Sequence, residues 1–156
     1  MRPHHALMTV ANKLRRLSVR VLSPVRLGAR AVPVGPDGRL LYVRHSYMPG
    51  WFFPGGAVDQ HETTAAAAIR ELVEETGLRP TGPATLLGIH FVLLHGISDH
   101  VTVYVAPVDG QPRVGGWEIV EAVWADPDHP PSPLDPSTAH QLEMFKGHLR
   151  ANQAPE

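Results

Sequence analysis

Three glutamates share one side of a short stretch whose pattern predicts a helix. Glu71, Glu74 and Glu75 lie within residues 63–76, and Gly77 follows, a residue type that commonly ends a helix. At about 100° per residue, the three carboxylates fall within about 100° of one another. The apolar side of the same helix is formed by Ile69, Leu72, Val73 and Thr76. We therefore expect one face that packs on the core and an opposite face that presents three carboxylates.

Local electrostatics disfavour this arrangement unless a cation joins it. Like charges three or four residues apart repel by a few tenths of a kcal/mol, and the C-terminal half of a helix favours cations. Arg70 relieves part of the repulsion. A divalent ion such as Mg²⁺ would relieve the rest, because it takes carboxylate oxygens and completes its shell with water and substrate phosphates. An ion held there could neutralise charge on a phosphoryl group and activate a water.

The alternative interpretation is a solvated acidic face that binds nothing. The turn at residues 54–56, Pro-Gly-Gly, argues against it, because glycine lets the backbone approach a ligand closely just before the acidic helix.

The spacing of these residues resembles the box that defines the Nudix family. That box is a glycine, five residues, a glutamate, seven residues, Arg-Glu, an aliphatic residue, any residue, Glu-Glu, any residue, a glycine and an aliphatic residue. The matching residues are Gly56, Glu62, Arg70, Glu71, Leu72, Glu74, Glu75, Gly77 and Leu78. One departure is His61, where the family usually has glycine.

The resemblance implies a metal site on this helix. Glu74 and Glu75 are implied as ligands, with the carbonyl of Gly55 as a further ligand, and Glu71 as a ligand or as the general base. The implied cofactor is Mg²⁺, with Mn²⁺ as the alternative.

Other box residues have supporting roles in the family. Arg70 is implied to orient the catalytic carboxylates together with Glu62, while Gly56, Glu62 and Gly77 maintain the structure of the motif.

Residues outside the box are candidates for catalysis and substrate binding. Family members often add one acid from a later loop; we expect Glu118 there, with Glu121 as its rival, so the general base stays open among Glu71 and these two. Arg44 could hold a phosphate, or form an ion pair at the rim. Trp51 could stack on a base or pack beneath the loop.

The function implied is attack of water on a phosphorus of a nucleoside diphosphate linked to another moiety. The partner is a small-molecule nucleotide, and its identity and the phosphorus attacked stay open, because markers of the known subfamilies are missing. Two alternatives remain: a catalytically silent nucleotide-binding or sensor module, and an RNA 5′-pyrophosphohydrolase. No aromatic RNA-binding pattern supports nucleic acid as a partner.

The periodicity along the rest of the chain predicts an α/β fold. Strands are expected over residues 25–34, 40–44, 86–94, 100–108 and 122–125, a loop over 46–56, a turn near 96–99 and a last helix over about 136–150. The resemblance implies the Nudix α/β/α sandwich, a mixed sheet between helices, with a short N-terminal helix added.

The expected organisation is an N-terminal helical extension (1–25), a Nudix domain (26–150) and a tail (151–156). Residues 6–18 predict an amphipathic helix, because one side carries Leu7, Val10, Leu14 and Leu17. This helix could mediate a homodimer. Residues 1–36 hold seven Arg or Lys and no acid, which suits an anionic partner or a solvated basic face.

Composition narrows the remaining classes. The 156 residues suit one domain, and 43% are hydrophobic, enough for a core. No cysteine is present, which excludes disulfides and cysteine-based zinc sites. No apolar run approaches the ~20 residues of a membrane span, and no secretory signal is recognisable. We expect a cytoplasmic protein.

Overall fold

The computed structural model describes residues 25–94, 97–114 and 117–153. The elements are β1 (Val25–Val34), β2 (Leu40–His45), β3 (Gly55–Ala57), α2 (Thr64–Thr76), β4 (Thr85–Leu94), β5 (Ile97–Pro107), β6 (Ile119–Ala125) and α3 (Pro136–Gln153). The helix expected over residues 6–18 lies outside the described residues, as does the extension of residues 1–25 apart from Val25, which belongs to β1.

The strands form one mixed sheet, as the sequence predicted. Their order is β4-β5-β1-β2-β6, and the short β3 pairs with β1. β1 runs parallel to β5, while the other pairs are antiparallel. The expected hairpin between β1 and β2 closes through a turn in which Gly38 adopts a φ of 80°, a conformation that glycine adopts without strain.

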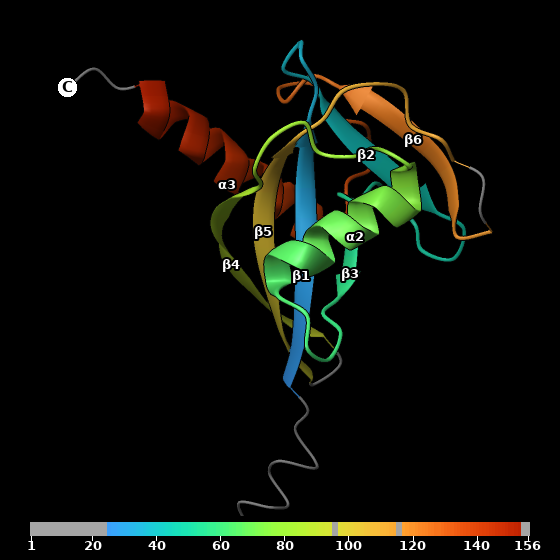
Figure 1. The fold of residues 1–156 in the computed structure, drawn as a ribbon, viewed down its shortest axis with the longest axis vertical. Coiled ribbons are helices and arrows are strands. Elements are labelled where there is room, and N and C mark those ends of the chain that lie inside the picture. The colour runs from blue at the N-terminus through green and yellow to red at the C-terminus, as the bar shows by residue number, and fades with distance from the viewer. Residues whose placement is uncertain (1–24, 95–96, 115–116, 154–156) are drawn as a thin grey trace, which may run out of the picture.

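The two helices cover opposite faces of the sheet (Figure 1). α2 packs on a cluster that includes Ala29, Ala31 and Leu72, and α3 packs its Leu142 and Phe145 on a second cluster. Burial of these side chains on both faces makes β1 the centre of the core. The expected sandwich is therefore present.

The ends of α2 explain where the helix begins and stops. The Thr63 side chain accepts a hydrogen bond from the Ala66 amide at 3.1 Å, which satisfies a free donor of the first turn. Gly77 has a φ of 71°, and its amide donates to the carbonyl of Val73 at 2.8 Å. The predicted bounds of this helix are confirmed to within one residue.

Several expected boundaries were wrong. β5 begins at Ile97, so residues 97–99 pair with β4 instead of forming the expected turn. β6 begins at Ile119 rather than at residue 122, and Ile119 is buried opposite His45. Residues 55 and 56, expected in a loop, form β3. In each case pairing with a neighbouring strand extends the element, and for β3 and the start of β6 the partner strand is distant in sequence.

Candidate active site

α2 turns two of its three glutamates toward the sheet, which corrects the expected separation of acidic and apolar faces. The Glu75 residue is only 9% exposed, and the side chain of Glu71 is 17% exposed, whereas that of Glu74 is 59% exposed. The buried side of the helix is centred between the expected faces: Ala67, Ala68, Leu72, Glu75 and Thr76. The carboxylates therefore lie at the border between core and solvent.

Two glycines of β3 allow close packing, one against a carboxylate of α2 and the other against β1. A Cβ added at Gly56 would lie 2.4 Å from Oε1 of Glu71, closer than real atoms approach. Gly55 has a φ of 151°, and a Cβ there would meet the carbonyl of Ala29 at 2.2 Å. Gly56 thus leaves space for the Glu71 carboxylate, and Gly55 allows β3 to lie directly against β1.

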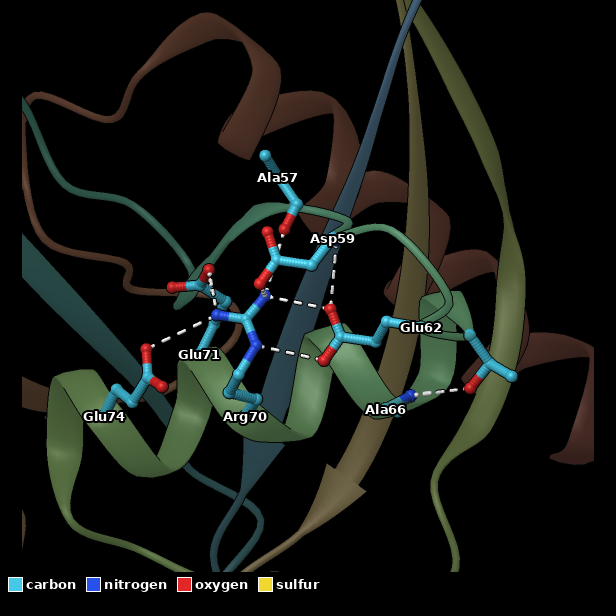
Figure 2. Close-up of polar contacts among 8 residues, drawn as sticks. Ala57, Asp59, Glu62, Ala66, Arg70, Glu71 and Glu74 are labelled. Carbon is cyan, nitrogen blue, oxygen red and sulfur yellow. Dashed lines mark hydrogen bonds and ion pairs between the residues drawn. The ribbon is translucent and has the colours of Figure 1, made fainter.

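Arg70 lies at the centre of a carboxylate network, as Figure 2 shows. Its Nε and Nη2 donate to the two oxygens of Glu62 at 3.0 Å each, and Nη1 donates to Glu71 at 2.7 Å. Nη1 also reaches Glu74 at 3.4 Å, and Nη2 reaches the carbonyl of Ala57 at 3.1 Å. These hydrogen bonds lower the pKa of Glu62 and raise the pKa of Arg70. The guanidinium therefore fixes the carboxylates relative to the loop before α2.

Glu75 differs in its electrostatics. Burial raises its pKa from the ordinary 4.5 to about 8, an effect that the charge of Arg30 opposes and that of Glu71 reinforces. Oε2 of Glu75 is buried and has no hydrogen-bond partner among the described residues. An unpartnered buried carboxylate oxygen is costly, so it points to a ligand or a proton.

The glutamates of α2 line a cavity of about 190 Å³ together with the start of β6. Its walls are Glu71, Glu74, Glu75, Arg113, Trp117, Glu118 and Ile119. Of the two rival acids, Glu118 lies in this cavity, whereas Glu121 does not. Within the described part of the chain, no three acidic or histidine side chains are grouped closely enough to hold a metal ion as they stand. The carboxylates share a cavity without converging on one point.

Tyr47 and His45 approach Glu118 from the β2 side. The Tyr47 hydroxyl donates to Oε1 of Glu118 at 2.6 Å, and this bond raises the pKa of Tyr47 to about 12. His45 is buried, with Nδ1 4.0 Å from the same oxygen, and burial lowers its pKa. Glu118 is therefore held by the Tyr47 hydroxyl, while the His45 ring lies close to it without a hydrogen bond.

A second, larger cavity of about 710 Å³ lies next to the first. Arg44, Tyr47, Trp51 and Glu121 are among its walls. Arg44 Nε donates to Glu121 at 3.0 Å, and its guanidinium carbon lies 5.8 Å from the Trp51 ring centre. Trp51 is partly buried against the cluster beneath α3. Arg44 therefore forms the ion pair that was one of its two expected roles, and Trp51 packs as in one of its own. Phosphate binding by Arg44 and base stacking by Trp51 stay predictions, and both residues line the cavity in which they would occur.

Sequence reasoning missed Arg30 and Tyr47. Arg30 donates to the carbonyls of Phe53 and Gly55, so it holds the glycine turn from β1. The Gly55 carbonyl, expected to face a metal ion, thus has a hydrogen-bond donor here. No sequence signal marks either residue, because each acts across a strand pairing that brings distant segments together.

No described helix is long and apolar enough to cross a membrane.

Comparison with known proteins gives a consistent result. The model of the NUDIX domain matches residues 24–146. A putative 8-oxo-dGTP diphosphatase of Bacillus subtilis is 29% identical over 119 residues, which are 76% of this chain and 78% of that protein. A CMP-5′-(N-acetyl-N-hydroxy-3-aminopropyl)phosphonate hydrolase of Streptomyces rubellomurinus is 39% identical over 98 residues, 59% of this chain but only 46% of its own length.

A solved structure agrees with these relatives. The MutT NUDIX hydrolase from Burkholderia pseudomallei superposes with a TM-score of 0.71 at 32% identity, covering 78% of this chain and 98% of that protein. With the family match spanning most of the chain and the sandwich fold in place, the protein belongs to the Nudix family and is an enzyme of the nucleotide pyrophosphohydrolase type.

Proposed function

We propose that the protein hydrolyses a phosphoanhydride bond in a nucleoside diphosphate linked to another moiety, with Mg²⁺ or, alternatively, Mn²⁺ bound at α2. The observation that carries this proposal is the buried, unpartnered Oε2 of Glu75 in a cavity that Glu71, Glu74 and Glu118 also line. The two curated relatives described above differ in the named substrate, so the proposal is limited to the type of bond.

The donor set fits a divalent cation. Mg²⁺ takes oxygen ligands and is usually bound by one or two carboxylates plus water and substrate phosphates. Glu75 offers an oxygen that lacks a protein donor, and Glu74 is largely exposed toward the same cavity. A cation would also offset the burial that raises the pKa of Glu75.

We assign the ligands to residues on this basis. Glu74 and Glu75 hold the ion, with Glu71 and Glu118 as further carboxylates in reach of the same cavity. The Gly55 carbonyl accepts from Arg30 in this structure, and its second lone pair is available for the ion. Bound Mg²⁺ supplies charge neutralisation at the phosphoryl group and a more acidic water.

The protein's own side chains provide the positioning and the proton transfer. Arg70 holds Glu62, Glu71 and Glu74 in one network, which keeps the carboxylates from repelling one another. Glu71 is bound by this guanidinium, whereas Glu118 is bound by the Tyr47 hydroxyl. Glu118 is therefore the better-placed acceptor for the proton of the attacking water, with Glu71 as its rival.

The larger cavity suits the nucleotide. Its volume of about 710 Å³ is in the range of small-molecule sites. Arg44 can turn from Glu121 to a phosphate, and the Trp51 ring lies beside it at the wall of the cavity. Tyr47 lines this cavity and contacts Glu118 in the smaller one, so a nucleotide bound here has its phosphates beside the glutamates.

A panel of nucleotides tests the proposal. Nucleoside triphosphates, nucleotide sugars, dinucleotides and 5′-triphosphorylated RNA are incubated with Mg²⁺ or Mn²⁺, and the products are separated by chromatography. We expect cleavage of at least one free nucleotide, and a loss of about 100-fold or more in Glu74→Gln. Glu143→Gln, an exposed glutamate on α3, is the matched control and should retain activity.

Two results would contradict the proposal. If Glu74→Gln cleaves the substrate as fast as the native enzyme, the glutamates of α2 do not take part in the reaction. Tight binding of one nucleotide without turnover across the panel would indicate the sensor alternative.

A further inference from the structure

The outer half of the sheet carries large apolar side chains that the described helices do not cover. We call this surface the outer apolar patch; it is formed by Val25, Leu27, Leu86, Ile89, Phe91 and Leu93. Val25 is 71% exposed, Leu93 65% and Ile89 63%. Exposed apolar side chains are normal singly, but a contiguous group of them marks an interaction surface.

Strand register places the patch on one face. Phe91 of β4 pairs with His100 of β5, which in turn pairs with Leu27 of β1. The next row outward is Leu93, Ser98 and Val25 in the same order. Because directly paired residues point to the same side of a sheet, these rows form one continuous surface.

This surface is the continuation of the face that α2 covers. One row further along, Ile89 pairs with Thr102 and Thr102 with Ala29, and Ala29 belongs to the core under α2. In Figure 1, α2 crosses in front of β1, while β4 lies to its left with none of the described helices in front of it. β4 is also the edge strand of the sheet, where natural proteins usually provide a cover.

The chain itself supplies a segment that ends at this place. The 24 residues before β1 lead directly into Val25, which is a member of the patch. Within them, residues 6–18 have the pattern of an amphipathic helix whose apolar side is formed by Leu7, Val10, Leu14 and Leu17. The same stretch carries Lys13, Arg15 and Arg16 on other sides.

The dimensions agree. A helix of that length is about 20 Å long and about 10 Å wide. The exposed stretch of β4 from residue 86 to 93 spans about 23 Å, and three adjacent strands span about 10 Å. Residues 19–24, which connect the expected helix to Val25, can span up to about 20 Å when extended. This length is enough for the helix to lie back across the outer apolar patch.

We propose that residues 6–18 bind the outer apolar patch as a helix, with Leu7, Val10, Leu14 and Leu17 against the sheet. The N-terminal segment is then a cover for the half of the sheet that α2 leaves open, rather than a contact for a second copy or an anionic partner. The basic side chains stay at the outer side in water.

The absence of cysteine from the chain allows a direct test. In the full chain, Ile89→Cys places a single thiol in the patch, and its rate of reaction with a water-soluble maleimide reports access. The rate is compared with that in chains that also carry Leu7→Asp and Leu14→Asp. The matched control carries Thr9→Asp and Asn12→Asp, the same charge on the polar side of the expected helix.

We expect the thiol of Ile89→Cys to react with the maleimide at least tenfold faster in the chain that carries Leu7→Asp and Leu14→Asp. The comparison is with the chain that has the native segment and with the chain that carries Thr9→Asp and Asn12→Asp. A second reporter, Ala68→Cys, lies on the fully buried side of α2 and should stay protected in all three chains, which shows that the domain is still folded. Equal rates at Ile89→Cys in the three chains would overturn the proposal. The proposal would also be overturned if the thiol lost its protection on dilution while the mass measured by sedimentation halved. A second copy of the chain would then cover the patch.

Discussion

The Tyr47 hydroxyl lies 2.6 Å from Oε1 of Glu118, and this hydrogen bond joins the two cavities of the protein. Tyr47 is part of the wall of the larger cavity, and Glu118 is part of the wall of the smaller one. A hydroxyl that donates to a carboxylate forms a short, charge-assisted bond, which fixes the direction of the acid. The position of Glu118 opposite α2 therefore depends on a residue of the loop after β2.

Tyr47→Phe keeps the ring and removes only the donor. We expect kcat to fall about tenfold, because partners that orient a metal-site or catalytic carboxylate typically contribute that much or more. The matched control is Tyr104→Phe, which removes a hydroxyl 2.6 Å from Thr64 Oγ1 and away from both cavities. Steady-state kinetics should show the loss in the first variant only; equal losses in both would argue against a positioning role for Tyr47.

Arg70→Lys tests the network at α2. Lysine retains the charge but cannot donate to both oxygens of Glu62 and to Glu71 at once, as the guanidinium does. We expect kcat/KM to fall between about 10-fold and 100-fold, with little change in Tm. Arg39→Lys, at an exposed ion pair with Asp37, is the control and should change neither quantity. A full-activity Arg70→Lys enzyme would show that the network does not position the carboxylates.

Gly56→Ala tests the close approach of β3 and α2. The added Cβ would lie 2.4 Å from Oε1 of Glu71, so the carboxylate has to move. We expect a loss of activity of about 100-fold and a weaker apparent affinity for Mg²⁺. Gly147→Ala is the control, because its Cβ would meet nothing closer than 4.0 Å and alanine favours the helix. If Gly56→Ala is as active as the control, the position of the Glu71 carboxylate beside Gly56 does not matter for activity.

Local signals in the sequence predicted the helix. The helical spacing of its residues and Gly77 act within a few residues, so α2 and the resemblance to the box followed from the chain alone. The strand end at Ile119 did not, because it depends on pairing with His45, which is distant in sequence. The expected turn was placed too late, because Ile97 already pairs with Leu94.

Burial was the other property that sequence could not supply. Helical spacing put Glu75 with the acids, but its exposure depends on how α2 packs on the sheet to bury Leu72. Arg30 likewise has no motif, and only the pairing of β1 with β3 brings it to Gly55. Tertiary packing decided both.

The raised pKa of Glu75 has a consequence for stability without metal. A carboxyl group with a pKa of 4.5 when unfolded and about 8 when folded stabilises the native state most below pH 4.5. That contribution is lost as the pH rises through about 8. At about 1.4 kcal/mol per pKa unit, the loss amounts to a few kcal/mol.

Urea unfolding in chelator across this pH range measures the effect. The free energy of unfolding of the native chain, relative to Glu75→Gln, should decrease by a few kcal/mol from about pH 5 to about pH 9. The comparison cancels the opposite dependence from His45, whose lowered pKa adds stability as the pH rises. If the difference in the free energy of unfolding does not vary with pH, burial does not raise the pKa of Glu75 in the folded protein.

Binding of Mn²⁺, followed by electron paramagnetic resonance in the absence of substrate, tests the central claim most directly. We expect the native chain and Glu143→Gln to bind the ion equally well, and Glu75→Gln and Glu74→Gln to bind it at least tenfold more weakly. Mn²⁺ affinity that is the same in all four proteins, or no binding by the native chain, would contradict a cation site at the glutamates of α2.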